Sequence, residues 1–182
     1  MKFVRMNVPY IFAVLTCVPI FVLIFIVPVS ADTELFQMIE MIIDHYLFGK
    51  VGMWSSTFPL GSKIITNYWC LVMPVFSAVF TYRVLQLSNC QREMYHGHSI
   101  RKLIFLIAAM VLMLVFFLYI SYVDDTDLAS AGRRFAVLGK YKVTYALFVS
   151  GILFAAYMLM VVSYIIFRFF PPVILARIRA TK

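Results

Sequence analysis

Four long apolar stretches constrain what this chain can fold into. They cover residues 8–29, 67–87, 103–123 and 145–170, and none of them contains Asp, Glu or His. A bilayer core about 30 Å thick needs roughly 20 apolar residues per helix, and a helix satisfies its backbone hydrogen bonds within itself. A hydrophobic content of 64% excludes an ordinary soluble domain. The sequence therefore predicts an all-α integral membrane protein, residues 1–182 forming one membrane domain with four transmembrane helices.

The distribution of charge predicts the orientation. The amino-terminal tail, the segment from Arg83 to Lys102 and the end from Arg168 onward hold ten of the 16 Lys and Arg residues but one of the eight acids. The positive-inside rule therefore predicts that both termini and loop 88–102 are cytoplasmic, and that loops 30–66 and 124–144 lie outside. Since topology accounts for the net charge of +8, that charge does not indicate nucleic acid as a partner. Aromatic residues suited to the outer interface are Tyr68, Trp69, Tyr119, Tyr122 and Tyr145.

The amino terminus has a second interpretation. A basic start, an apolar run and the sequence Val29-Ser30-Ala31 resemble a secretory signal peptide, so cleavage of residues 1–31 stays open as an alternative. The apolar run of roughly 22 residues exceeds the roughly 7–15 of a usual signal core. We expect it to be retained as a helix, which Pro19 kinks.

The first outer loop contains an amphipathic pattern. In DTELFQMIEMIIDHYLFG the polar residues Thr33, Gln37, Glu40 and Asp44 recur at helical spacing between apolar ones. We expect a helix with Asp32 as its N-cap that ends near Gly49. Its apolar face is expected in the acyl boundary, and its acidic polar face, unusual for a lipid anchor, leaves partner binding as an alternative. Residues 54–56 are expected to form an irregular return to the second span.

Enzymatic and metal-binding functions find little support. Cys90, His96 and His98 have suitable ligand types, but a zinc site needs three or four converging ligands. The acids of Asp124-Asp125-Thr126-Asp127 lack the glycine and terminal glutamate of a calcium loop. The sequence therefore predicts no metal, no cofactor, no structural disulfide and no catalytic activity.

A transporter or channel subunit is an alternative that four helices permit. Carriers usually place ionisable groups or broken helices at the membrane midplane, whereas these spans carry charge only at Arg83 and Arg168, near their ends. In the last span Gly151 and Ala155, with Ser150 beside them, form a small-xxx-small pattern that predicts close helix packing.

The second outer loop combines acids and bases. Three aspartates at 124, 125 and 127 are followed by twin arginines, Arg133 and Arg134, and then by Lys140 and Lys142. Exposed charges of this kind can simply pair with one another for roughly 0–1 kcal/mol. Against a protein partner they set register and association rate, so a binding role is the competing hypothesis.

A family resemblance rests on this loop. The run from Leu118 to Phe154 resembles the matching region of immunity proteins for A-type pore-forming colicins, through Asp125-Thr126-Asp127-Leu128, Ala131-Gly132-Arg133 and Leu147-Phe148. The basic tail PPVILARIRATK is similar in character, and a weaker likeness lies around residues 67–74. Arg134 stands where some members of that family have proline. The resemblance covers about 70 carboxy-terminal residues.

The resemblance implies a multi-pass protein of the bacterial inner membrane with both termini cytoplasmic and loops 30–66 and 124–144 in the periplasm. Its implied function is to bind the channel domain of a cognate colicin in the bilayer and prevent channel opening. An accessory subunit of a larger membrane complex stays open as a further alternative. The expected toxin contacts are Asp125, Asp127, Gly132, Arg133, Arg134, Lys140 and Lys142, with Ser150, Gly151 and Ala155 as helix-packing positions.

Overall fold

The structure, a computed structural model, describes residues 8–87 and 99–180, except for the side chains of Arg133, Arg134 and Ala180. These ranges form helices and two short strands. In chain order they are α1 (Tyr10–Ile26), α2 (Glu34–Tyr46), β1 (Gly52–Trp54), α3 (Pro59–Leu87), α4 (Ile100–Tyr122), β2 (Asp125–Asp127), α5 (Arg133–Lys140) and α6 (Lys142–Ala180).

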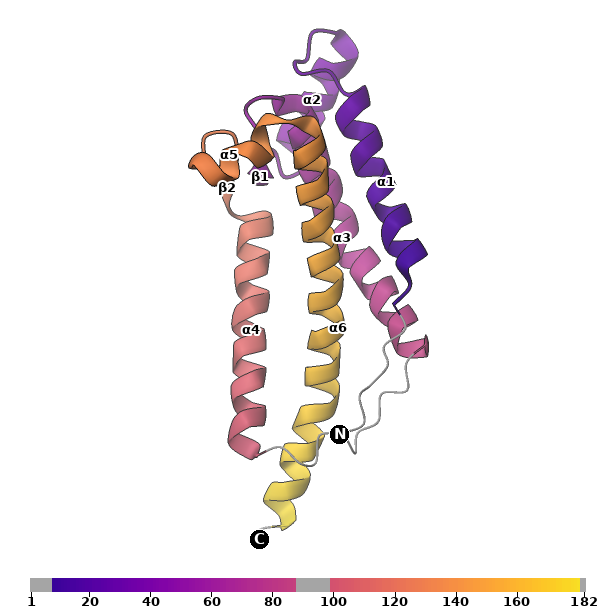
Figure 1. Ribbon diagram of the computed structural model, residues 1–182, viewed down its shortest axis with the longest axis vertical. Helices are drawn as coiled ribbons and strands as arrows, with labels where there is room; N and C mark the ends of the chain where they lie inside the picture. The colour runs from indigo at the N-terminus through magenta and orange to yellow at the C-terminus, as the bar shows by residue number, and fades with distance from the viewer. Residues whose placement is uncertain (1–7, 88–98, 181–182) are drawn as a thin grey trace.

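Four helices form a bundle, as Figure 1 shows. Helices α1, α3, α4 and α6 run alternately up and down its long axis, and α2, β1, β2 and α5 gather at one end. We call this the loop end, which comprises residues 27–58 and 123–141, and the opposite end, where α3 and α6 finish and α4 begins, the tail end. Both loops predicted to share one side of a membrane therefore lie at the same end of the bundle.

Three helices are long and apolar enough to cross a membrane: Pro59–Gln86, Ile100–Tyr122 and Lys142–Arg179. The remaining apolar helix, α1, has 17 residues. At 1.5 Å per residue it is about 25 Å long, less than the roughly 30 Å of a bilayer core. The predicted span over 8–29 is thus helical across a shorter range than its apolar window.

Two other helices extend beyond their predicted ends. Helix α3 begins at Pro59 rather than at 67, and α6 continues through Pro171 and Pro172 to Ala180 rather than ending at 170. Proline suits a first helical turn, where its missing N–H is not needed. An apolar window misses both extensions because their outer turns carry polar side chains, Ser62 and Lys63 in α3 and Arg177 and Arg179 in α6.

The core centres on α6. Tyr157 of α6 is fully buried, stacks on Phe80 of α3 with ring centroids 4.8 Å apart, and donates its hydroxyl hydrogen to Thr16 Oγ1 of α1 at 2.8 Å. A second, smaller cluster near the tail end joins α4 to α6 through Leu103 and Phe170. Most of α4 is exposed, with 11% of its spanning window buried. This leaves a long apolar face of α4 for surrounding lipid or a partner.

A proline in α3 explains how α4 is attached at the loop end. Pro74 has no N–H, so the carbonyl of Cys70 lacks its usual helical donor. The Tyr122 hydroxyl of α4 donates to that carbonyl at 2.7 Å, and the Cys70 thiol donates to the Ser121 carbonyl at 3.3 Å. The carbonyl that the proline leaves without a donor is thereby satisfied by a neighbouring helix, as a membrane-spanning helix would require.

The two loops are joined by a small parallel sheet. Strands β1 and β2 pair in the register Gly52↔Asp125, Met53↔Thr126 and Trp54↔Asp127. At Gly52 the backbone has φ +65°, and an added Cβ would lie 3.4 Å from the Ser121 carbonyl oxygen, so glycine suits this position. The expectation of an irregular return over 54–56 is therefore wrong at Trp54, because pairing with a distant strand orders it.

Candidate functional site

The candidate site is the surface of the loop end, where both predicted outer loops meet. Asp127 at the end of β2 connects them, since its Oδ1 accepts hydrogen bonds from the Ser56 N–H at 2.9 Å and the Ala129 N–H at 3.0 Å. Partial burial acts to raise the pKa of Asp127, but the hydrogen bonds from Ser56 and Ala129 outweigh it and hold that pKa below its usual value. Asp127 thus holds two loops together.

The other predicted contact residues are spread over this surface. Asp125, Gly132 and Lys140 are exposed, whereas Lys142 is half-buried and donates to the Val27 carbonyl at 3.4 Å, which links the start of α6 to the end of α1. Among the described side chains of loop 124–144, no acid forms a salt bridge. Backbone atoms of Arg133 and Arg134 begin α5, and their side chains lie outside the described part of the chain.

Gly139, which is buried beneath this surface, is a residue that sequence reasoning missed. It lies where α5 crosses the turn after β2, and an added Cβ would collide with the Ala129 nitrogen and lie 2.6 Å from the Leu128 carbonyl carbon. The Ser55 hydroxyl donates to the Gly139 carbonyl at 2.5 Å. Only glycine therefore lets α5 lie this close to the turn. The available signal was a glycine within the helical stretch RRFAVLGK.

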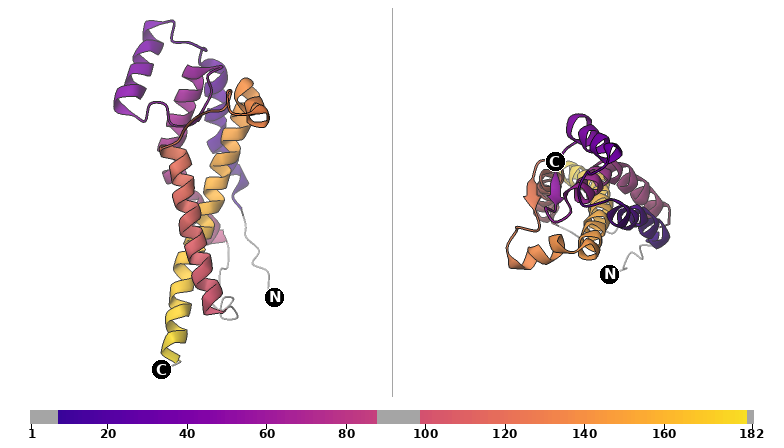
Figure 2. Two further views of the ribbon diagram at one scale, coloured as in Figure 1. Left: turned by 90° about the vertical axis from the view of Figure 1, so that its left-hand side faces the viewer. Right: turned by 90° about the horizontal axis from the view of Figure 1, so that it is seen from above.

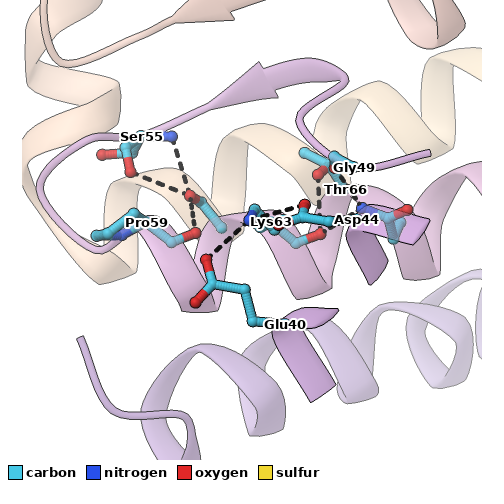
Figure 3. Close-up of polar contacts among 9 residues, drawn as sticks. Glu40, Asp44, Gly49, Ser55, Pro59, Lys63 and Thr66 are labelled. Carbon is cyan, nitrogen blue, oxygen red and sulfur yellow. Dashed lines mark hydrogen bonds and ion pairs between the residues drawn. The ribbon is translucent and has the colours of Figure 1, made fainter. Parts of the chain in front are cut away.

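Helix α2 is held by its acidic face (Figure 3). Lys63 of α3 is 3% exposed, and its Nζ lies 2.8 Å from Glu40 Oε1 and 2.9 Å from Asp44 Oδ1. One turn further along α3, Asn67 Nδ2 donates to the Gly49 carbonyl at 2.8 Å, and the Phe48 N–H donates to Asn67 Oδ1 at 2.9 Å. Two polar residues on one face of α3 thus fix α2.

This arrangement gives the acidic face of the amphipathic helix a partner within the chain, and the placement of its apolar face in the acyl boundary stays a prediction. Its acidic face turns inward to Lys63, while its apolar side is exposed at Leu35, Met38, Met41, Ile42 and Tyr46. In Figure 2 α2 stands out beside the rest of the loop end. The N-cap is Thr33 rather than Asp32, whose Oδ2 accepts a hydrogen bond from Ser30. The helix ends at Tyr46, and the Gly49 N–H donates to the Ile43 carbonyl at 3.1 Å.

The small residues of α6 face outward. Gly151 and Ala155 are exposed, and an added Cβ at Gly151 would meet nothing within 4 Å. Ser150 is half-buried beside them. Contacts of α6 with its neighbours run instead through residues such as Leu153 and Ala156. Within the described ranges the small pair is left open, and its packing against a partner helix stays a prediction.

An apolar groove runs between α3 and α4 with α6 as its floor. It consists of two adjoining cavities, of about 600 Å³ and about 300 Å³, which share Leu114 and Met160. Ser77 lines the part nearer the loop end, where its buried hydroxyl has no hydrogen-bond partner among the described residues. Arg168 lines the part nearer the tail end.

The described ranges contain no cluster of three or more His, Cys, Asp or Glu side chains that could hold a metal ion. Cys90, His96 and His98, where the sequence predicts no metal site, lie outside the described residues. Cys17 and Cys70 are both free thiols.

Comparisons with known proteins return nothing: no family model, no curated protein and no solved structure matches this chain.

Proposed function

We propose that this chain is an immunity protein that binds the channel-forming domain of a colicin in the bacterial inner membrane and keeps the channel closed. The observation that carries the proposal is the organisation of the loop end. The segment that resembles the colicin immunity family, Asp125 to Arg133, forms β2 and the turn into α5, and it is tied to the first loop by strand pairing and by Asp127. Such a surface is preorganised for one partner.

The proposed topology has four spans, with both termini in the cytoplasm and the loop end in the periplasm. Three helices have the length for this, and α1 crosses if the bilayer thins locally or flanking residues adapt, each at a modest cost. The position of both loops at one end of the bundle supports the charge argument. A toxin that enters from the periplasm then meets the loop end first.

Inhibition needs no turnover. A ligand shifts an equilibrium between closed and open channel only by its difference in affinity for the two states. The loop end contributes recognition through Asp125, Lys140 and the twin arginines, since matched or clashing charges separate related partners. Within the bilayer, the open small-residue face at Gly151 and Ala155 offers close approach to an inserted toxin helix.

The test is protection of sensitive cells that express the chain and are challenged with a panel of pore-forming colicins. We expect survival against at least one colicin, and we expect the charge reversal Arg133→Glu with Arg134→Glu to weaken protection at an equal amount of membrane-inserted protein. Lys50→Glu, a charge reversal in the first loop, is the control, and we expect it to leave protection unchanged. Undiminished protection by the double variant would contradict the assigned contacts.

Failure to protect against any colicin in a broad panel would overturn the proposed function itself. An accessory subunit of a larger membrane complex would then be the better explanation, because the joined loop surface also suits a resident partner. A toxin gene adjacent to the gene for this chain would separate the two explanations without any variant.

A further inference from the structure

We propose that the groove between α3, α4 and α6 binds an anionic phospholipid, with one acyl chain in the groove and the phosphate on Arg168. The proposal rests on the bilayer placement given above and is independent of the toxin.

The groove has the shape of a slot along the bundle axis. On α3 it is lined at successive turns by Ala78 and Tyr82, and on α6 by Met160, Tyr164 and Arg168. With its second part it extends along α3 from residue 73 to residue 85. Twelve residues of helix span about 18 Å, close to half of a bilayer core about 30 Å thick. Its length thus matches one leaflet.

The loop-end side of the groove is closed. There the Tyr122 hydroxyl bonds to the Cys70 carbonyl at 2.7 Å, and the rings of Trp69 and Phe117 pack with centroids 6.3 Å apart. A transmembrane helix needs roughly 20 residues across the full core, so it could not lie along this slot without separating α3 from α4. An acyl chain that enters from the tail end stops where the groove stops.

The tail-end mouth of the groove is polar and basic. Arg168 is exposed there, and the rings of Tyr82 and Tyr164 beside it are 61% and 43% exposed. Among the described residues Arg168 makes no salt bridge, and the described part of the tail end carries Arg83, Arg101 and Lys102 but no acid. A guanidinium matches phosphate with two parallel hydrogen bonds, and basic pockets between spans at the cytoplasmic side bind anionic head groups.

Ser77 is the feature that a hydrocarbon chain does not satisfy. Its hydroxyl lies at the inner part of the groove without a partner among the described residues. A partner helix with a small polar side chain would supply one, and such a helix is the competing occupant. Ser77→Ala therefore tests the acyl-chain placement: phosphatidylglycerol binding should not change, because a hydrocarbon chain makes no hydrogen bond with this hydroxyl.

The experiment measures lipid binding to the full-length protein in mild detergent by native mass spectrometry, during titration with phosphatidylglycerol or phosphatidylcholine. We expect one tightly held phosphatidylglycerol per chain and weaker binding of phosphatidylcholine. Arg168→Gln is expected to weaken the first phosphatidylglycerol roughly fivefold or more, since one basic residue near a membrane surface contributes about 1 kcal/mol toward anionic lipid. Arg83→Gln is the matched control, because Arg83 is also exposed near the end of its span but does not line the groove.

A second variant tests the chain-binding part. Ala78→Phe places a ring into the slot while Arg168 stays in place, and we expect it to abolish the tight phosphatidylglycerol site; Ala78 is exposed, so the core is not overpacked. Soluble glycerol phosphate, which has the headgroup chemistry without a chain, is expected not to compete. Equal losses in Arg168→Gln and Arg83→Gln, full retention in Ala78→Phe, or competition by glycerol phosphate would each overturn the proposal. A loss of phosphatidylglycerol binding in Ser77→Ala would also overturn it, because an acyl chain makes no contact that depends on this hydroxyl. Absence of a tight phosphatidylglycerol site in the wild-type protein would overturn the proposal and leave the helix as the occupant.

Discussion

Replacing Lys63 with Met tests what holds α2 against the bundle. Met keeps an unbranched apolar stem but removes the ammonium group that donates to both Glu40 and Asp44. A hydrogen bond to a charged group contributes about 1.5–3 kcal/mol. The Glu40 and Asp44 side chains remain 39% and 46% exposed, so water screens the interaction, and we expect their joint loss to cost about 1–2 kcal/mol.

The expected effect is a local opening of α2. Its main neighbour is α3, which holds α2 at Lys63 and the turn after α2 at Asn67, so α2 can detach while the rest of the bundle stays folded. A cost of 1–2 kcal/mol corresponds to about 5–30-fold more of the open form. Hydrogen exchange in the α2 segment, measured on the purified protein, should accelerate by that factor, and exchange in α6 should not change. Lys50→Met is the control, since Lys50 is exposed over the Trp54 ring.

Unchanged exchange in α2 would refute this reasoning. Equal acceleration in α2 and α6 would refute it as well, because Lys63 would then support the packing of α3 rather than the docking of α2. A double-mutant comparison sharpens the result: Glu40→Gln with Asp44→Asn should open α2 to a similar degree, and adding Lys63→Met to that pair should add little.

Three further predictions follow from single contacts. Gly139→Ala should lower stability by about 1–3 kcal/mol because the added Cβ meets the backbone of residues 128 and 129. Gly151→Ala is the control, since open space surrounds Gly151 and the variant's thermal midpoint in detergent should stay unchanged or rise slightly. Equal thermal midpoints for the two variants would contradict the tight approach at Gly139. Tyr122→Phe should lower the free energy of unfolding by about 1 kcal/mol in the wild-type protein. The loss should be smaller in a Pro74→Ala background, where the substituted residue supplies an N–H to the Cys70 carbonyl. An equal loss in both backgrounds would rule out Pro74 as the reason for this hydrogen bond. The pKa of Asp127 is lower in the folded protein than its ordinary value of 3.8, so its stabilising effect is present above that value and is lost as the pH falls through the folded pKa. Asp127→Asn should therefore be less stable than wild type near neutral pH. A difference in stability between the two proteins that did not narrow in acid would argue against the hydrogen-bonded carboxylate as its cause.

Helix existence was predictable from this sequence, and helix ends were not. Apolar windows locate four helices because a lipid-facing or buried helix must be apolar over a long run. They miss the first turns of α3, since Ser62 and Lys63 make that stretch polar, and they cannot show that α2 covers it. The burial of Lys63 depends on a helix 19 to 23 residues earlier in the chain, a separation that local patterns do not encode.

The sequence predicts where the candidate site lies, and that stays a prediction, but it does not predict the structural roles of the residues there. Charge bookkeeping and the family resemblance both indicated residues 124–144, which lie at the loop end. The three-residue strands are too short for an alternating pattern, and their pairing joins positions more than 70 residues apart. Asp127 was therefore grouped with the contact residues, although its hydrogen bonds to Ser56 and Ala129 give it a role within the fold.

This double role of the loop residues decides how toxin contacts can be mapped. Because Asp127 joins β2 to Ser56, and β1 pairs with β2, a substitution in the second loop also disturbs the first. Loss of protection in Asp127→Asn would then report a displaced first loop as readily as a lost contact. Asp125 provides the discriminating comparison, since it lies on the same strand with an exposed side chain. If Asp125→Asn impairs protection while hydrogen exchange in residues 52–56 stays as in wild type, the effect belongs to the surface proposed to meet a toxin.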